Sequence, residues 1–176
     1  MKLHIGCGHN YLPGWTNLDI DKSVKCDRYE DATVLNTIEN NSCDIIYACH
    51  ILEHFSRHDY LNVLSTWFQK LKKGGRLRLS VPDFSQVVKV YNSTQNIDEL
   101  VGLIVGGQKD EHDFHQIIFD EKKLSRELLE IGFDEVKKWD WRLSSHGSFD
   151  DYSQAYLPHM DKDKGKLMSL NLEAYK

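Results

Sequence analysis

Two glycines and an aspartate near the N-terminus have the spacing of a nucleotide site. The short apolar run Leu3-His4-Ile5 ends at Gly6-Cys7-Gly8, and Asp19 ends the next alternating run, at residues 16–21. Glycine lets backbone N–H groups approach a ligand that a Cβ would exclude, and a carboxylate after the adjacent strand can accept both hydroxyls of a ribose. A turn glycine or a surface aspartate is the ordinary alternative for each residue, but their order favours a nucleotide-type ligand.

A second carboxylate, Asp31, precedes Ala32 and follows a weak strand signal at residues 24–26. Such a carboxylate can accept a hydrogen bond from the exocyclic amine of a base, although an aspartate in a turn is equally ordinary.

The segment His50-Ile51-Leu52-Glu53-His54 matches the zinc-binding pattern H-x-x-E-H, with two imidazoles about one helical turn apart. His58, Glu111, His112 and His115 extend the set of possible ligands. A metallopeptidase needs this segment inside a helix, but here it directly follows a strand signal. We therefore expect no metal, and we favour a structural role in which Glu53 and His54 bond the backbone near the strand end.

Several other polar or aromatic residues could act on a second substrate, although exposed or packed side chains are at least as common an explanation. Asp83 follows a strand, His112 and His115 stand in a polar stretch, and His146 lies in a long final loop. Four aromatic residues could stack on a planar or sugar substrate, and we assign them no catalytic role: Trp139, Trp141, Tyr152 and Tyr156.

The elements that must position these residues alternate between strands and helices, which predicts a mostly parallel sheet with crossover helices. Strands are predicted at 3–5, 16–21, 44–48, 76–81, 134–141 and 169–174, and helices at 61–71, 84–91, 97–105 and 121–131. Residues 144–166 are polar and structureless by pattern, and such a long loop is usually functional or disordered.

Composition narrows the class of protein. A length of 176 residues fits one domain, and 22 basic against 27 acidic residues, a net charge of −5, argue against a nucleic-acid partner. No run approaches the roughly 20 apolar residues of a membrane span, and the N-terminus does not resemble a signal peptide. Four cysteines without C-x-x-C spacing indicate reduced thiols in a cytoplasmic protein. The sequence gives no indication of the oligomeric state.

Taken in order, these motifs resemble the class I S-adenosylmethionine-dependent methyltransferases, in a small bacterial-type form. The likeness is carried by residues 3–8 and 14–19, by Asp31-Ala32-Thr33, by residues 42–54, and by Leu71-Lys72-Lys73-Gly74-Gly75 before a strand ending at Val81-Pro82-Asp83. It extends to Gly132-Phe133 and the last strand. It implies a single domain over 1–176, a three-layer Rossmann-like α/β sandwich, and a mainly parallel seven-stranded sheet whose last strand is antiparallel.

The resemblance also implies roles for individual residues, with S-adenosylmethionine across the carboxyl ends of the first four strands. Gly6, Cys7 and Gly8 would pack against its methionine and ribose moieties, Asp19 would take the ribose hydroxyls, and Ile20 would lie against the adenine. Asp31 would accept the adenine amino group, with Ala32 nearby. Cys49 and His50 would face the methionine portion, and Asp83 would contact the second substrate.

Three departures from the family pattern stand out. His4 replaces the usual acidic residue, Asn10 replaces a third glycine, and the first helix is shortened to a loop. Short relatives around polysaccharide-building enzymes share these features, so we interpret them as a subfamily trait.

The expected activity is methyl transfer to a small acceptor, at oxygen rather than nitrogen, with a sugar or polysaccharide precursor favoured by the resemblance. An alcohol acceptor benefits from a base of near-neutral pKa, for which His50 and His115 are the candidates. Two alternatives remain. One is an NAD-dependent oxidoreductase, which the sequence disfavours because Tyr11 stands where the G-x-G-x-x-G motif needs its third glycine. The other is a non-catalytic partner subunit that binds the cofactor.

Overall fold

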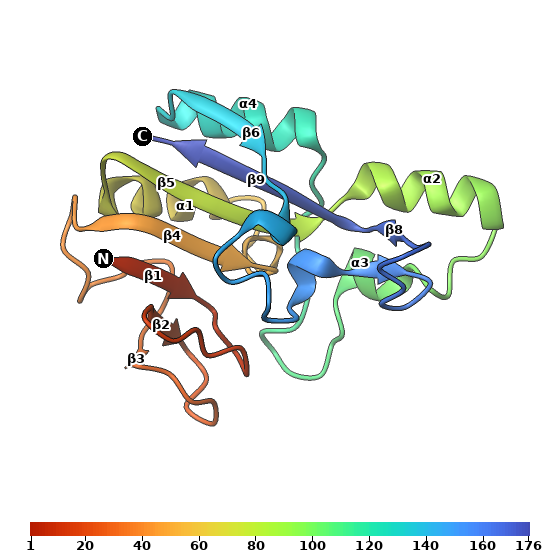
Figure 1. The fold of residues 1–176 in the computed structure, drawn as a ribbon, viewed down its shortest axis with the longest axis horizontal. Helices are drawn as coiled ribbons and strands as arrows, with labels where there is room; N and C mark the ends of the chain where they lie inside the picture. The colour runs from red at the N-terminus through yellow and green to blue at the C-terminus, as the bar shows by residue number, and fades with distance from the viewer.

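A twisted seven-stranded sheet forms the centre of the computed structural model, which describes residues 1–176 (Figure 1). In spatial order the strands are β3 (Arg28–Tyr29), β2 (Thr16–Asp19), β1 (Lys2–Ile5), β4 (Cys43–Cys49), β5 (Leu71–Pro82), β9 (Ser169–Tyr175) and β6 (Glu135–Lys138). Only β9 is antiparallel to its neighbours β5 and β6. The predicted mainly parallel sheet with an antiparallel last strand is confirmed.

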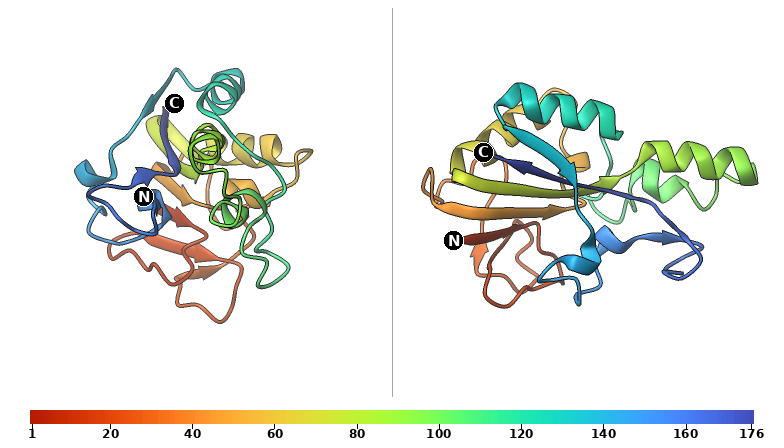
Figure 2. Two further views of the ribbon diagram at one scale, coloured as in Figure 1. Left: turned by 90° about the vertical axis from the view of Figure 1, so that its right-hand side faces the viewer. Right: turned by 45° about the horizontal axis from the view of Figure 1, so that its top comes forward.

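Two helices, α1 (Tyr60–Lys70) and α4 (Glu121–Ile131), cover one face of the sheet (Figure 2). Helix α4 begins where predicted, because the Asp120 side chain accepts a hydrogen bond from Lys123 N at 2.7 Å. Helices α2 (Phe84–Thr94) and α3 (Val101–Val105) extend beyond the carboxyl edge (Figure 1). The helix predicted at 97–105 is shorter than expected, since Leu100 N and Val101 N close a turn on Ile97 O. No helix is long and apolar enough to cross a membrane.

The helical face of the sheet holds the apolar core. Alternate residues of a strand point to one face, so every second residue of each strand meets the helices. The buried strand residues are Leu3, Ile5, Leu18, Ile46, Ala48, Leu77, Leu79, Val81, Leu170, Leu172 and Ala174, and they pack against helix residues that include Leu64, Trp67, Leu124 and Leu128.

The opposite face is covered by an irregular segment, residues 139–157, which forms the third layer of the α/β fold (Figure 2). No helix connects β1 to β2, β2 to β3 or β3 to β4. The segment contains the short 3₁₀ turns η2 (Trp141–Leu143) and η3 (Tyr152–Gln154), and β7 (Tyr156–Leu157) pairs with β8 (Lys166–Leu167). The prediction that 144–166 lacks regular structure is confirmed for most of the segment and wrong at η3, β7 and the start of β8.

Polar side chains of the sheet hold this segment in place. Tyr47 donates its hydroxyl hydrogen to Asp151 at 2.6 Å, and Arg78 donates to Glu173 at 2.8 Å and to His146 Nε2 at 2.9 Å. His146 is thus a buried acceptor in a structural network and does not face a substrate. His4 belongs to the same face, because it stacks on Tyr47 with ring centroids 5.2 Å apart. The unusual residue at position 4 is explained by this packing.

Candidate active site

The glycine turn after β1 is shaped by two different demands. Gly6 has a φ of +62°, and a Cβ there would lie 2.0 Å from Ile51 Cδ1, so this glycine allows the segment after β4 to pack closely. Gly8 has a φ of +49°, and a Cβ there would meet nothing within 4 Å. Burial raises the pKa of the Cys7 thiol to about 12, so Cys7 is not a nucleophile at neutral pH. The turn is therefore closely packed against Ile51 at Gly6 and has free space beside Gly8.

Asp19, at the end of β2, ties the turn to the next strand. Its Oδ2 accepts a hydrogen bond from Gly8 N at 2.7 Å, and its Oδ1 accepts one from Asp21 N at 2.9 Å. The residue is 9% exposed, and each carboxylate oxygen can accept a further hydrogen bond. Ile20 beside it is 48% exposed, an apolar surface next to the carboxylate.

The carboxyl end of β3 extends the same edge. Glu30 N donates to Asp19 O at 2.9 Å, which places the following Asp31 beyond Asp19 along the edge. Asp31 is exposed and accepts from Thr33 N through Oδ1, which leaves Oδ2 free. The Ala32 carbonyl accepts from Trp67 Nε1 at 2.8 Å and anchors this loop to the core. The open Gly8, the two carboxylates and exposed Ile20 fit an adenosyl group lying across β1, β2 and β3.

The end of β4 carries a buried pair of ionisable side chains. His50 Nε2 lies 2.8 Å from Ser169 Oγ, and that hydroxyl donates to the Tyr152 carbonyl, so Nε2 carries the ring hydrogen. His50 Nδ1 then faces Glu53 Oε1 at 3.2 Å. Burial raises the pKa of Glu53 to about 8 and lowers that of His50. Burial thus favours the neutral form of both groups.

The chain between α3 and α4 docks against the turn η1 (Leu52–His54) that follows β4. Gln116 donates from its backbone N to Glu53 O and from its side chain to His54 O, both at 2.8 Å. This docking brings His115 beside His54, with ring centroids 5.0 Å apart, and places His115 Nε2 4.0 Å from Glu53 Oε1. His54 bonds the backbone at Phe114 O, as predicted, but the Glu53 carboxylate, predicted to do the same, has no hydrogen-bond partner.

A cavity of about 390 Å³ opens beside these side chains. The residues lining it include His50, His54, His115, Tyr152, Tyr156 and Met168. Asp83, predicted to contact substrate, does not line this cavity, because it caps α2 by accepting from Ser85 N at 2.9 Å. Tyr152 and Tyr156, two of the four aromatic residues that the sequence indicated could stack on a substrate, do line this cavity, whereas no pattern indicated Met168.

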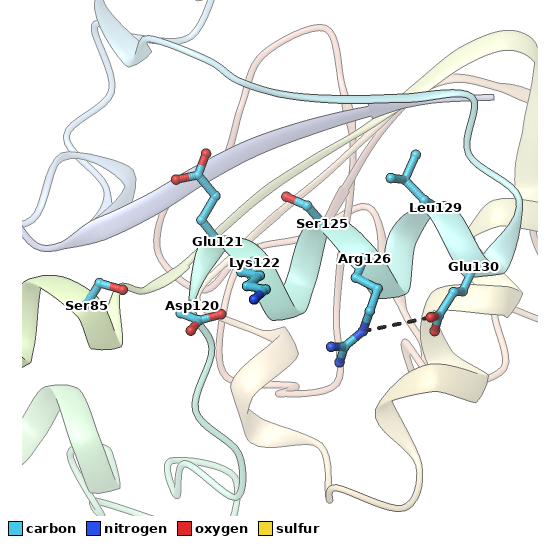
Figure 3. A pocket seen from close by; sticks show the side chains of 8 residues that line it. All are labelled: Ser85, Asp120, Glu121, Lys122, Ser125, Arg126, Leu129 and Glu130. Atoms are coloured by element: carbon cyan, nitrogen blue, oxygen red, sulfur yellow. Dashed lines mark ion pairs between the residues drawn. The ribbon is translucent and has the colours of Figure 1, made fainter.

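A larger groove, of about 860 Å³, runs along the outer side of α4 (Figure 3). Its lining is mostly exposed side chains of one helix, and Arg126 Nε pairs with Glu130 Oε1 across it at 3.8 Å. None of the predicted site residues lines this groove, and its polar surface side chains form no catalytic arrangement.

Comparison with known proteins agrees with this geometry. Residues 3–79 match the family model described as a methyltransferase domain. A methyltransferase from Archaeoglobus fulgidus that depends on S-adenosylmethionine is 16% identical, with 99% of this chain and 85% of that chain covered and a TM-score of 0.61. One from Methanosarcina mazei is 16% identical, with coverage of 99% and 91% and a TM-score of 0.61.

A third similar structure holds ligands. It is the 1,6-didemethyltoxoflavin-N1-methyltransferase of Burkholderia thailandensis, with bound 1,6-didemethyltoxoflavin and S-adenosylhomocysteine. It is 13% identical, with 99% of this chain and 70% of that chain covered and a TM-score of 0.58. A search of curated proteins found no match. At these identities the solved structures establish a shared fold.

Proposed function

We propose that this chain, which its methyltransferase-domain match and its fold identify as a class I S-adenosylmethionine-dependent methyltransferase, methylates an oxygen atom of a small acceptor. The observation that supports this proposal most is the cavity lined by His50, His54 and His115 at the carboxyl end of β4. Its volume of about 390 Å³ lies within the range of small-molecule sites.

The residues around the glycine turn are proposed to hold the cofactor. Gly6, Cys7 and Gly8 would form the surface under its methionine and ribose parts, and Asp19 has acceptor capacity left for the ribose hydroxyls. Ile20 would cover the adenine, whose amino group would donate to Asp31 beside Ala32. Cys49 would border the methionine part. When bound, the cofactor supplies an electrophilic methyl group on a sulfonium sulfur.

The chain's part in the reaction is orientation and exclusion of water. In-line displacement at carbon is accelerated mainly when the two reacting atoms are held at the right distance and angle. Both ring nitrogens of His50 already have partners, Ser169 and Glu53, so its proposed role is to contact the acceptor as part of the cavity wall and not to act as the base. His115 has a free Nε2 at the cavity wall and is proposed to take the hydroxyl proton.

A sugar or another polyhydroxylated precursor is the proposed acceptor class. Two tyrosines, Tyr152 and Tyr156, line the cavity, and aromatic rings commonly pack against sugar rings through their apolar faces. The net charge of −5 supports a small acceptor over a nucleic acid. All four cysteines are free thiols, which supports the proposal of a cytoplasmic location.

Titration calorimetry with S-adenosylhomocysteine tests the cofactor site. We expect Asp19→Ala to weaken binding about 100-fold or more, because a ribose contact and the hold on Gly8 N are both lost. Asp134→Ala is the matched control, since it removes the same charge from an exposed residue at the opposite edge of the sheet. Equal affinity in Asp19→Ala and wild type would contradict the assignment.

Two further outcomes separate the alternatives. Thermal stabilisation by NAD and not by S-adenosylhomocysteine would favour an oxidoreductase, because only a true ligand raises the melting temperature. Binding of S-adenosylhomocysteine without methyl transfer to any of a panel of sugars and other alcohols would favour a partner subunit.

A further inference from the structure

Three side chains from two distant segments converge at the inner end of the cavity. Glu53 and His54 come from η1, and His115 comes from the chain between α3 and α4. One ligand atom from each, a carboxylate oxygen or an imidazole nitrogen, can be chosen so that all three lie within 4.8 Å of one another. This set differs from the H-x-x-E-H pattern, because His115 takes the place of His50, whose Nε2 bonds Ser169 and whose Nδ1 faces Glu53.

The hydrogen bonds of the two histidines decide which nitrogen is available. His54 Nδ1 lies 3.2 Å from the Phe114 carbonyl oxygen, and His115 Nδ1 lies 3.2 Å from the Leu103 carbonyl oxygen. A carbonyl oxygen only accepts, so each Nδ1 carries the hydrogen and each Nε2 presents a lone pair. Metal-ligating histidines have this arrangement, in which one nitrogen binds the ion and the other donates to a main-chain carbonyl.

The carboxylate of Glu53 is unusual for its burial. The residue is 1% exposed, and neither carboxylate oxygen has a hydrogen-bond partner. A buried polar group without partners is costly unless it binds something. Two imidazole nitrogens lie near the same oxygen: His50 Nδ1 is 3.2 Å and His115 Nε2 is 4.0 Å from Glu53 Oε1. Glu53 is therefore a buried acid whose Oε1 lies close to two imidazole nitrogens and whose Oε2 has no partner.

The backbone keeps this cluster together without a ligand. Gln116 holds the second segment to Glu53 and His54 by two hydrogen bonds at 2.8 Å. Gly106 has a φ of +82°, and a Cβ there would lie 2.3 Å from Asp113 O, so the tight turn that leads to His115 requires glycine. These constraints pre-position the three side chains.

We propose that Glu53, His54 and His115 bind a first-row divalent cation, with Zn²⁺ as the best fit. Two imidazoles and one carboxylate are a known ligand set of catalytic zinc, at about 2.0–2.2 Å per bond, with a further position left for water or substrate. Imidazole nitrogens favour such a cation over Mg²⁺ or Ca²⁺, which prefer oxygen. His54 and His115 also line the cavity, so the open position faces the acceptor.

The cation site stands on its own geometry, whereas its part in methyl transfer rests on the proposed function. A hydroxyl bound to the cation would lose its proton to water in the open cavity more easily, because the positive charge would stabilise the negative charge left on its oxygen. His115 would then be a ligand of the cation and not a base, because the cation itself would make the hydroxyl more acidic. His50 becomes the residue that orients Glu53.

Cobalt titration after chelator treatment tests the site in the full chain. Co²⁺ in a site with nitrogen ligands and low coordination number gives visible absorption bands, and added Zn²⁺ should remove them by competition. We expect wild type to bind one Co²⁺ per chain. Glu53→Gln, His54→Ala and His115→Ala should each weaken Co²⁺ and Zn²⁺ about 100-fold or more, because one of three ligands is lost.

His112→Ala is the matched control, because His112 stands three residues before His115 and its side chain is 61% exposed. We expect it to bind Co²⁺ as wild type does. Circular dichroism checks that each variant is folded, and a rise in the melting temperature of wild type with Zn²⁺ provides a second measurement that needs no variant.

Absence of Co²⁺ bands and of Zn²⁺ stabilisation in wild type would overturn the cation site, as would equal weakening by His112→Ala and His115→Ala. These results are independent of the proposed function. If S-adenosylhomocysteine binds and methyl transfer proceeds unchanged with chelator, the methyltransferase stands and the proposed part of the cation in the reaction fails. If Co²⁺ binds as expected but no alcohol is methylated, the site stands and the proposed function fails.

Discussion

The two faces of the central sheet are built from the same strands by opposite chemistry. On one face, Leu77 and Leu79 meet the apolar sides of α1 and α4. On the other, Arg78 and Ser80 from the same strand bond Glu173 and Asn171 of the neighbouring strand, under the irregular segment 139–157. Strand alternation places neighbouring residues on opposite faces, so a single strand serves an apolar helical layer and a polar irregular one.

This difference shows two ways to cover a sheet. Helices satisfy their own backbone, so the face beneath them needs only apolar side chains. An irregular segment leaves polar groups that need partners, and here the sheet supplies them: Tyr47 bonds Asp151, and Asn171 Nδ2 donates to Ser153 O at 2.9 Å. The stability of the polar face therefore depends on specific hydrogen-bonded pairs, whereas that of the helical face depends on how well apolar side chains fill the space.

The largest effect is expected on the helical face. Trp67→Ala empties a fully buried site and should lower the free energy of unfolding by about 3–5 kcal/mol. Leu61→Ala is the control, because Leu61 lies on the same helix and is substantially exposed, and we expect a loss below about 1 kcal/mol. Urea unfolding measures both, and similar losses would show that this face does not depend on close packing.

Breaking the main ion pair of the polar face should have the next largest effect. Arg78→Met leaves Glu173 buried with weaker partners, and we expect a loss of about 3 kcal/mol. Adding Glu173→Leu should recover part of that loss, because the uncompensated charge is then gone. Lys137→Met, which removes an exposed pair with Glu135, should cost less than about 1 kcal/mol. A double variant less stable than Arg78→Met would contradict this interpretation.

Acid should weaken the polar face selectively through His146. Burial, and then the nearby Arg78, lower the pKa of His146 to about 4 against the favourable charges of Asp151 and Glu173, and burial lowers the pKa of His4 as well. Between about pH 6.5 and pH 4 the unfolded chain then binds more protons than the folded one, so stability falls as pH falls.

The slope from His146 in that window should be on the order of 1 kcal/mol per pH unit. His146→Gln keeps an acceptor for Arg78 but does not titrate, so its stability should fall less steeply with acid than that of wild type. Chemical unfolding at several pH values measures both slopes. Parallel slopes would show that His146 is not the residue responsible.

The smallest effect concerns a single hydrogen bond, from Tyr47 to Asp151. Tyr47→Phe removes the hydroxyl bonded to Asp151 and should cost about 1–2 kcal/mol, because the buried carboxylate keeps its bonds from Ser153. Tyr152→Phe alters a largely exposed hydroxyl and serves as the control. If the two variants were equally stable, the Tyr47–Asp151 bond would not hold the segment to the sheet.

Much of the secondary structure could be predicted because its signals are local. The β-branched run Asp44–Ala48 lies inside β4, and the Asp120 cap marks the start of α4. The irregular segment could not be predicted in this way. Its order comes from partners such as Tyr47 and Asp151, which are 104 residues apart and have no periodic pattern.

One part of the candidate site could likewise be predicted from local sequence, and another part could not. The glycine turn and Asp19 are close in sequence and recognisable as a motif, and the hydrogen bond from Gly8 N joins them in the fold. The H-x-x-E-H segment was also recognisable, but its pattern suggested His50 and His54 as the ligand pair. The set that converges instead includes His115, which reaches Glu53 through the docking of Gln116.

The sequence by itself determined the order of strands and helices, the alternation that gives the sheet two unlike faces, and the glycine and carboxylate motif, because neighbouring residues encode these features. Only the tertiary structure decided which polar groups meet across the irregular layer and which three side chains converge beside the cavity. Those contacts form only when segments that are distant in sequence pack together, and a local sequence pattern carries no information about where a loop will dock.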